Sequence, residues 1–291
     1  MRARRALLYV PGSDLHKIEK AAALDVDGVI LDLEDSVSLN RKDEARQIIA
    51  HALGTLDFGR SERLVRINPF YTGRAQADLQ AVLPFKPDTI VVPKVDNADI
   101  LEEVEEILTR AEVDMNLAKD SIEVIALIES ARAFLNLPAI CTAPPRLKGL
   151  IFGAEDLTAD AGMTRTAGGA ELLFSRSMLA LHAAAFELQA IDMVQPNFSD
   201  IERLIAEARQ AADLGYSGKQ VIHPAQIEPV QKVFTPEPSA IEHAQRIIAS
   251  AADAAESGRG AFSLDGEMVD LPVIKRAQTI LVRARAAGLI P

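Results

Sequence analysis

The stretch Leu150-Ile-Phe-Gly-Ala-Glu-Asp156 passes from a hydrophobic segment through a glycine into two adjacent carboxylates. This order is typical of a buried strand that reaches the surface and presents acidic groups at its carboxyl end. Four other hydrophobic segments carry ionisable residues in the same place. These residues are Glu34 and Asp35 after 29–33, Arg66 within 64–68, Lys94 after 90–93, and Glu129 after 124–128. Ionisable groups at one end of five strands predict a single polar site built on a parallel sheet.

Strand-like and helix-like segments alternate along roughly the first 230 residues, and this alternation predicts a parallel sheet. Eight such units match the size of a closed (β/α)8 TIM barrel. An open doubly wound sheet would have fewer strands and a glycine-rich first turn, which Val10-Pro-Gly-Ser13 does not provide. The expected strands are 6–10, 28–33, 63–68, 89–92, 122–128, 149–152, 190–194 and 219–222. The expected helices are 13–24, 41–53, 75–83, 99–111, a helix that follows Glu129 and ends before Pro144-Pro145, 170–188 and 200–214.

The domain boundary is expected after residue 234, with a catalytic barrel in 1–234 and a helical extension in 235–291. Two helices, 239–256 and 271–287, are predicted in the extension, joined by a flexible link at Ser257-Gly-Arg-Gly260 and a small loop or hairpin at 262–270. One interpretation is a lid or arm that completes a neighbouring subunit's site. The alternative, two helices packed on the barrel exterior, explains the acidic residue Asp270 less well.

Composition narrows the class of protein. The net charge of −11 disfavours a nucleic-acid partner, because phosphate binding requires a basic face. The single cysteine, Cys141, excludes an internal disulfide, fits a reducing compartment, and is expected to be a buried structural thiol. The hydrophobic run before Pro11 is too short for a signal sequence or a membrane span, so we expect a cytoplasmic protein.

Glu129 and Asp156 follow neighbouring strands, which lie about 5 Å apart in a sheet. Two carboxylates at matching heights could share a divalent ion, and an oxygen-only ligand set is typical of magnesium. The alternative is that both are solvated strand ends. Zinc is disfavoured, because no metal-ligand spacing is found among His16, His51, His182, His223 and His243.

Arg66 lies in an otherwise hydrophobic strand, and arginine is rarely buried without an anionic partner. Its planar fork suits a carboxylate or enolate oxygen of a substrate. The alternative is an internal salt bridge to Glu34, Asp35 or another nearby acid, and the two roles can coexist. Lys94 is expected either to steer an anion or to hold Glu34 and Asp35 in place.

Several stretches together resemble one family. The stretches are Tyr9-Val-Pro-Gly12, Leu31-Asp-Leu-Glu-Asp-Ser36, Val65-Arg-Ile-Asn68, Val92-Pro-Lys94, Ile128-Glu-Ser130, Phe152-Gly-Ala-Glu-Asp156, Ile222-His-Pro-Ala-Gln-Ile227 and Gly266-Glu-Met-Val-Asp270. With them the chain resembles the citrate lyase β-subunit family of acyl-CoA lyases, within the magnesium-dependent HpcH/HpaI barrel aldolases. Its first 70 residues and the segment 218–270 are most similar to the citramalyl-CoA lyase branch, whereas the stretch 171–176 and the C-terminal helix also resemble the β subunit of citrate lyase itself.

The resemblance implies a role for each matched residue. Glu129 and Asp156 would bind Mg²⁺, with Mn²⁺ as a substitute, and Arg66 would bind the keto-acid or thioester oxygen. Asp270 would be the acid/base, supplied by a neighbouring subunit of a trimer or hexamer. Contacts to substrate or CoA would come from Tyr9, Lys17, Lys20, Glu155, Ile222 and His223, with Glu34, Asp35 and Lys94 in support.

Two positions depart from the family pattern. Asp14 stands where relatives carry an arginine near the CoA phosphates, so Lys17 is the candidate to replace that contact. In Gln195-Pro-Asn-Phe198, relatives more often have an aspartate before the phenylalanine, which bears on substrate preference.

Three functions compete. The first is a stand-alone lyase that releases acetyl-CoA and pyruvate from (S)-citramalyl-CoA, or glyoxylate from malyl-CoA, by reversible Claisen chemistry. The second is a citrate lyase β subunit that cleaves a citryl-thioester of a carrier protein to oxaloacetate, together with α and γ subunits. The third is an inactive scaffold subunit, which has no need for the complete set of Arg66, Glu129, Asp156 and Asp270.

Overall fold

The structure is a computed structural model that describes residues 2–142, 145–256 and 260–291. It divides into two compact units. The first is Arg4–Gln231, and the second is Lys232–Pro291 with the few residues before Arg4. The division falls near residue 234, where the sequence places the boundary.

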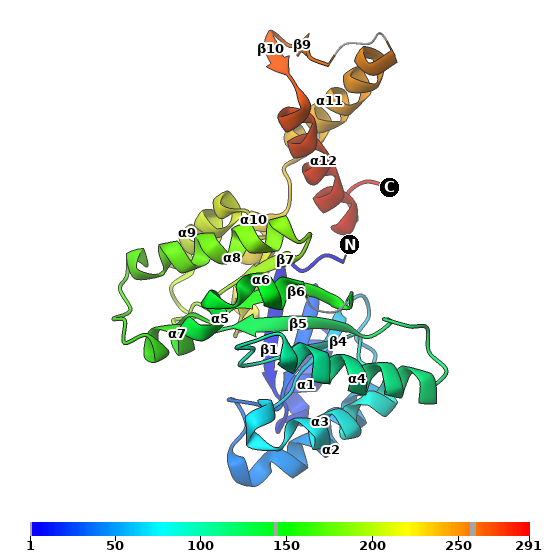
Figure 1. The fold of residues 1–291 in the computed structure, drawn as a ribbon, viewed down its shortest axis with the longest axis vertical. Coiled ribbons are helices and arrows are strands. Elements are labelled where there is room, and N and C mark those ends of the chain that lie inside the picture. The colour runs from blue at the N-terminus through cyan, green and yellow to red at the C-terminus, as the bar shows by residue number, and fades with distance from the viewer. Residues whose placement is uncertain (1, 143–144, 257–259) are drawn as a thin grey trace. The chain divides into compact units, whose positions relative to one another are not determined.

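Eight parallel strands close into a barrel in chain order, so the predicted (β/α)8 barrel is confirmed (Figure 1). The last strand pairs with the first through Ala6 and Lys219. The strands are β1 (Ala6–Pro11), β2 (Gly28–Asp32), β3 (Glu62–Arg66), β4 (Thr89–Val92), β5 (Glu123–Ile128), β6 (Leu147–Phe152), β7 (Gln189–Asp192) and β8 (Gly218–Val221).

Helices follow the strands. They are α1 (Leu15–Ala22), α2 (Lys42–Thr55), α3 (Ala75–Val82), α4 (Asp99–Asp114), α5 (Ala131–Leu135), α6 (Leu137–Cys141), α7 (Ala154–Asp160), α8 (Leu173–Ala185), α9 (Ile201–Leu214) and α10 (Ile227–Phe234).

Two of these helices, α7 and α10, are absent from the sequence-based assignment. Because α7 begins directly after β6, Glu155 and Asp156 lie in a first helical turn and not at a strand end. In α10 the hydrophobic residues Ile227, Val230 and Phe234 are buried at helical spacing, and Pro229 is tolerated because it stands in the first turn. Helix α8 is also shorter than the predicted 170–188.

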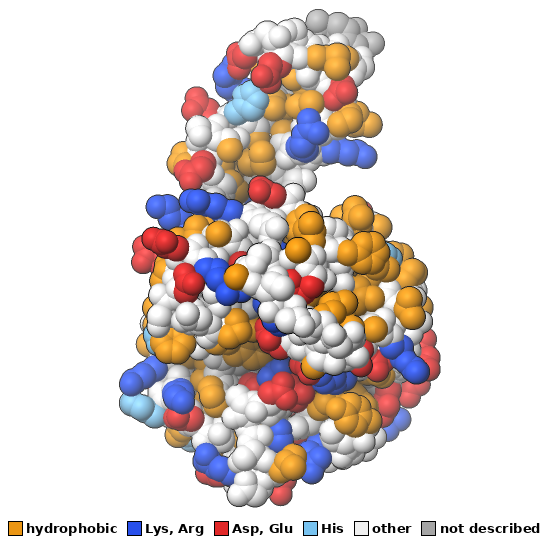
Figure 2. Space-filling model, turned by 90° about the vertical axis from the view of Figure 1, so that its left-hand side faces the viewer, with side chains coloured by type: hydrophobic (Ala, Val, Ile, Leu, Met, Phe, Trp, Pro, Cys, Tyr) orange, Lys and Arg blue, Asp and Glu red, His pale blue; other side chains and the backbone are white. Residues whose placement is uncertain are grey.

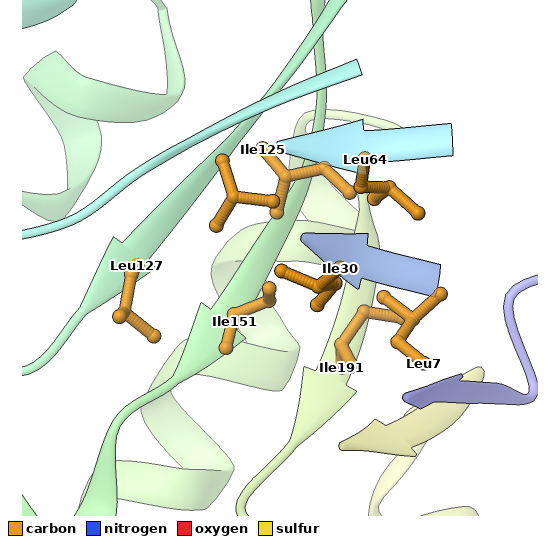
Figure 3. Close-up of a cluster of buried hydrophobic side chains, with 8 residues drawn as sticks. Leu7, Ile30, Leu64, Ile125, Leu127, Ile151 and Ile191 are labelled. Carbon is orange, nitrogen blue, oxygen red and sulfur yellow. The ribbon is translucent and has the colours of Figure 1, made fainter. Parts of the chain in front are cut away.

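The barrel interior is filled by hydrophobic side chains, one or two from each of seven strands (Figure 3). All of them are almost completely buried, so the barrel has a packed core and not a pore. Polar groups are therefore confined to the two ends of the barrel. The core side chains are Leu7, Ile30, Leu64, Val91, Ile125, Leu127, Ile151 and Ile191.

The amino end of the barrel is closed by Arg4. Its guanidinium donates to Glu62 at 2.6 and 2.7 Å and to Gln189 at 2.8 Å, and it also pairs with Glu123. The Arg4 side chain is 1% exposed. Polar groups at the amino end of a (β/α)8 barrel serve stability, whereas chemistry is found at the carboxyl end.

The second unit pairs α11 (Pro238–Glu256) with α12 (Leu271–Ala286). Strands β9 (Phe262–Leu264) and β10 (Glu267–Val269) form an antiparallel hairpin, as the sequence predicts for 262–270. The predicted flexible link at Ser257–Gly260 lies largely outside the described residues. Ile241, Ile247 and Leu281 are buried in the core of this unit.

The face of the molecule drawn in Figure 2 has no large patch of a single charge. Over the barrel unit, acidic and basic side chains are interspersed on that face. Among the described residues, no helix is both long enough and apolar enough to cross a membrane.

We expect Arg4→Met to lower the free energy of unfolding by about 3–5 kcal/mol, because Glu62 would stay buried without its partner. Urea unfolding followed by circular dichroism measures this. Arg41→Met is the matched control, because Arg41 pairs with Glu44 at the exposed surface; its unfolding midpoint should not move. Equal midpoints for the two variants would show that the Arg4 network does not stabilise the barrel.

Candidate active site

A pocket of about 360 Å³ opens at the carboxyl ends of the barrel strands. It brings together residues that the sequence analysis singled out from six separate segments, namely Tyr9, Asp35, Arg66, Glu129, Glu155 with Asp156, and Ile222. A larger groove of about 540 Å³ lies between α3 and α4, away from these residues. The pocket is lined by Tyr9, Asp32, Asp35, Ser36, Arg66, Leu127, Glu129, Phe152, Gly153, Ala154, Glu155, Asp156, Val194, Gln220 and Ile222.

Arg66 is the last residue of β3 and pairs in register with Asp32, the last residue of β2. Arg66 Nε and Nη2 donate to the two oxygens of Asp32 at 2.6 and 2.7 Å. The remaining nitrogen, Nη1, lies 2.7 Å from Glu34 Oε2 and 3.6 Å from Asp35 Oδ2. The expected ion pairs to Glu34 and Asp35 are therefore present, but the main partner is Asp32. Pairing the predicted strands 28–33 and 63–68 in register would have found it.

Glu129 directly follows β5 and is 3% exposed, and Asp156 faces it from the first turn of α7. Lys94 joins them, because its Nζ lies 2.5 Å from Asp156 Oδ1 and 3.6 Å from Glu129 Oε1. Its backbone N–H also donates to Glu129 Oε1 at 2.8 Å. The expected partner Glu34 contributes only a weaker attraction to Lys94, and the role of Lys94 in steering an anion stays a prediction. The backbone of Lys94 is left-handed (φ 54°), and its charge pairs with the acids of β5 and α7 instead.

The acidic side chains at the pocket differ in pKa, because their burial and their charged neighbours differ. Burial, assisted by the Asp156 carboxylate and opposed by Lys94, raises the pKa of Glu129 to about 8. Burial and the neighbouring Asp35 raise the pKa of Glu34 to about 7, against the attraction of Arg66. Burial also acts on Asp32, but the Arg66 guanidinium overcomes it and holds the pKa of Asp32 below its usual value.

Gly153 allows the chain to turn from β6 into α7 directly beside Glu129. A Cβ at this position would lie 2.4 Å from Glu129 Cβ and 2.9 Å from Glu129 Oε2. No larger residue fits without moving that carboxylate. The glycine between the hydrophobic segment and Glu155-Asp156 thus sets the spacing between Glu129 and Asp156.

The donor set fits a hard divalent cation. Glu129 and Asp156 offer only oxygens, and the raised pKa of Glu129 shows that its negative charge is poorly compensated by the protein. No group of three or more His, Cys, Asp or Glu side chains is placed to hold a metal in the described parts of the chain. Two carboxylates, with the other positions left to water and substrate, form the usual magnesium arrangement.

Comparison with known proteins identifies the family. A model of the HpcH/HpaI aldolase/citrate lyase family matches residues 5–224, and a model of C–C bond lyases of the TIM-barrel fold matches residues 172–289. The chain belongs to the HpcH/HpaI aldolase/citrate lyase family. The predicted family is therefore confirmed, as is the class of carbon–carbon lyase.

Individual relatives cover nearly the whole chain. Mitochondrial citramalyl-CoA lyase of Rattus norvegicus is 39% identical over 97% of this chain and 86% of its own. Citrate lyase subunit beta of Leuconostoc mesenteroides subsp. cremoris is 37% identical over 99% of this chain and 96% of its own. The crystal structure of CitE from Mycobacterium tuberculosis in complex with magnesium, acetoacetate and coenzyme A is 36% identical, with a TM-score of 0.76 over 97% of this chain and 98% of that chain.

Of the other predicted contacts, three line the pocket and three lie outside its lining. Tyr9 and Ile222 line it, and Glu155 lines it while pairing with Arg165 at 3.1 Å. His223 does not line it; its Nδ1 accepts from the Ala225 N–H at 3.1 Å, and its ring stacks on Phe198.

Three further predicted residues belong to helices. Lys17 and Lys20 are exposed on α1, where Lys17 pairs with the N-cap Asp14 at 3.4 Å. Asp270 lies in the second unit and caps α12 by accepting from the Val273 N–H at 3.3 Å. Cys141 is buried as predicted, and burial raises the pKa of its thiol to about 11.

The raised pKa of Glu129 predicts a pH dependence of stability. Folded Glu129 binds a proton up to about pH 8, whereas the unfolded carboxyl releases it near 4.5. Its contribution is therefore complete below about pH 4.5 and is lost as the pH rises towards 8. In EDTA, the free energy of unfolding of Glu129→Gln relative to wild type should rise between pH 5 and pH 8, by about 3–4 kcal/mol.

Glu44→Gln is the control, because Arg41 lowers the pKa of exposed Glu44 and any pH effect has the opposite sign. Urea unfolding at four pH values gives the comparison. A Glu129→Gln difference that stays constant with pH would mean that Glu129 is ionised throughout this range.

Proposed function

We propose that this chain is a Mg²⁺-dependent lyase that cleaves (S)-citramalyl-CoA to acetyl-CoA and pyruvate. The observation that carries the proposal is the convergence of Glu129, Asp156 and Arg66 on one pocket at the carboxyl end of the barrel. The similarity to the rat citramalyl-CoA lyase, and to CitE in complex with magnesium and coenzyme A, supports it. Malyl-CoA, which would give glyoxylate, is a second substrate, because one methyl group changes binding by only about 1–3 kcal/mol.

Each residue contributes a separate part of the reaction. Glu129 and Asp156 would hold Mg²⁺, with Mn²⁺ as a substitute. When bound, the ion supplies Lewis-acid polarisation of the substrate's carboxylate and hydroxyl oxygens. Arg66 donates to the oxygen on which negative charge develops, from a guanidinium already oriented by Asp32.

The bond that breaks joins the hydroxyl-bearing carbon to the CH₂ carbon of the thioester. Its electron pair passes into the thioester as an enolate, while the hydroxyl releases its proton to water and becomes the ketone of pyruvate. Asp270, which is protonated at the start of cleavage, then gives its proton to the enolate carbon to form acetyl-CoA, and it removes the same proton in the condensing direction. Asp270 regains a proton from water, so the proton released and the proton consumed balance. We propose that Asp270 comes from a neighbouring subunit of a trimer or hexamer.

The CoA moiety would lie along the rim of the pocket. Tyr9 and Ile222 contact the thioester end, with Glu155 and His223 nearby. Lys17 and Lys20 are exposed on α1 and would bind the phosphates. A cytoplasmic location remains a prediction, and the rat relative is named as mitochondrial.

A second candidate function is that of a citrate lyase β subunit, which would act on a carrier-protein thioester and release oxaloacetate. The 37% identity to such a subunit over 99% of this chain favours it. An inactive scaffold is a weaker candidate, because Arg66, Glu129, Asp156 and Asp270 are all present.

A cleavage assay with (S)-citramalyl-CoA and (S)-malyl-CoA tests the proposal, with acetyl-CoA and the keto acid both quantified. We expect turnover that EDTA abolishes and Mg²⁺ restores. Asp270→Asn should lower kcat by about 10²- to 10⁴-fold, because general acid–base help is lost. Asp265→Asn is the matched control, since Asp265 lies on the same hairpin and pairs with Arg246 at the exposed surface.

Two results would count against these assignments. Full activity of Asp270→Asn would remove the acid/base role from that residue. No turnover of either ester by folded wild-type protein would favour the carrier-protein substrate of a citrate lyase β subunit.

A further inference from the structure

Asp32 fixes Arg66 at two points. Its two oxygens accept Arg66 Nε and Nη2 at 2.6 and 2.7 Å, and the Asp32 side chain is 1% exposed. The guanidinium cannot rotate about its Cζ–Nε bond without breaking the Nη2 hydrogen bond. A two-point contact of this kind sets direction as well as charge.

Asp32 is itself anchored by the backbone that follows β2. It accepts the Glu34 N–H at 2.9 Å, the Ser36 N–H at 3.0 Å and the Ser36 hydroxyl at 2.5 Å. On the other side, the Arg66 Cζ lies 4.8 Å from the centre of the Tyr9 ring. The guanidinium thus lies against the Tyr9 ring, and the two hydrogen bonds to Asp32 restrain its rotation.

The third nitrogen, Nη1, has a weaker partner. It lies 2.7 Å from Glu34 Oε2, but without the alignment of a hydrogen bond. That buried oxygen receives no hydrogen bond from the described part of the chain. Of the two acids that pair closely with Arg66, Asp32 is therefore held in place and Glu34 is replaceable.

We propose that Asp32 is a positioning residue, which directs Arg66 Nη1 into the pocket, and that an oxygen of the bound 2-oxo acid replaces Glu34 on that nitrogen. This inference rests on the proposed function. Arg66 Nη1 is then the atom that binds substrate, and the neighbouring acids Asp32 and Glu34 have different roles. Asp32 stays bound to Arg66 throughout, whereas Glu34 gives way.

The structure contains a matched control for this arrangement. Asp192, at the end of β7, holds Arg176 of α8 through the same two nitrogens, at 3.0 and 3.1 Å. Asp192 and Arg176 are also almost completely buried, but neither lines the pocket. Loss of this second pair reports on the structural cost alone.

The first test needs no substrate and no metal. With ¹⁵N-labelled arginine, the Arg66 side-chain signal is assigned by its disappearance in Arg66→Lys. We expect slow rotation about Cζ–Nε in wild type, fast rotation in Asp32→Asn, and slow rotation in Asp192→Asn and Glu34→Gln. Unchanged slow rotation in Asp32→Asn would overturn the positioning role, whatever reaction the protein catalyses.

The second test measures pyruvate binding by calorimetry with saturating Mg²⁺. Asp32→Asn should weaken binding about 10- to 100-fold, the value of a hydrogen bond to a charged group. The same change in an Arg66→Ala background should cost nothing more, because Asp32 acts only through Arg66. Glu34→Gln should tighten binding several-fold, and Asp192→Asn should leave it unchanged.

Specific outcomes separate the two proposals. The inference would be overturned if Asp32→Asn lowered pyruvate affinity equally in the wild-type and Arg66→Ala backgrounds. Weaker pyruvate binding by Glu34→Gln would also overturn it. Wild-type protein that binds neither pyruvate, glyoxylate nor oxaloacetate would contradict the proposed function, while the rotation measurement still decides the role of Asp32. If Asp32→Asn does not fold, Ser36→Ala replaces it, since loss of that hydroxyl loosens Asp32 and should speed Arg66 rotation in the same direction.

Discussion

The packed barrel interior is the constraint on which the rest of the structure depends. Side chains such as Leu7, Ile125 and Ile191 fill it completely, so no charged group can sit there without a large desolvation cost. Charged side chains that point into the barrel are therefore found at its two ends. At the amino end, Arg4 and its acids form a closed network, whereas at the carboxyl end the charges surround a pocket. The same desolvation cost thus accounts for a structural cluster of charges at one end of the barrel and a candidate site at the other.

The pocket is not electrically balanced by the protein alone. Arg66 and Lys94 are the cations that pair with its acids, and the acids outnumber them: Asp32, Glu34, Asp35, Glu129 and Asp156. Asp32 keeps its charge because Arg66 is bound to it at two points. Glu129 and Glu34, with weaker partners, have raised pKa values instead. A site with surplus buried acid is suited to bind a cation, and its ionisation state then depends on that cation.

The sequence predicts the barrel and most of the pocket, because both follow from one pattern. Hydrophobic segments that end in ionisable residues identify strands and also place Arg66, Glu129 and Asp156 at one end of them. Contacts between segments are harder to predict, since they depend on register and backbone geometry. The Asp32–Arg66 pair requires the register of β2 and β3, and the partners of Lys94 follow from its left-handed backbone. Helix α7 escapes prediction because Gly153 turns the chain into a helix with no intervening loop.

The two aspartate–arginine pairs show that the surroundings of an ion pair, and not the pair itself, decide whether its arginine can bind a substrate. Asp32–Arg66 and Asp192–Arg176 have the same two-point geometry and similar burial. In the second, Arg176 also donates to Gln210, and Asp192 also accepts from Lys219, so that pair is enclosed by further partners. In the first, Arg66 keeps one nitrogen facing Glu34 Oε2, an oxygen that receives no hydrogen bond from the described residues. An arginine fixed in direction but incompletely paired can bind a substrate oxygen without reorganising, and that preorganisation is the main source of electrostatic stabilisation of a transition state.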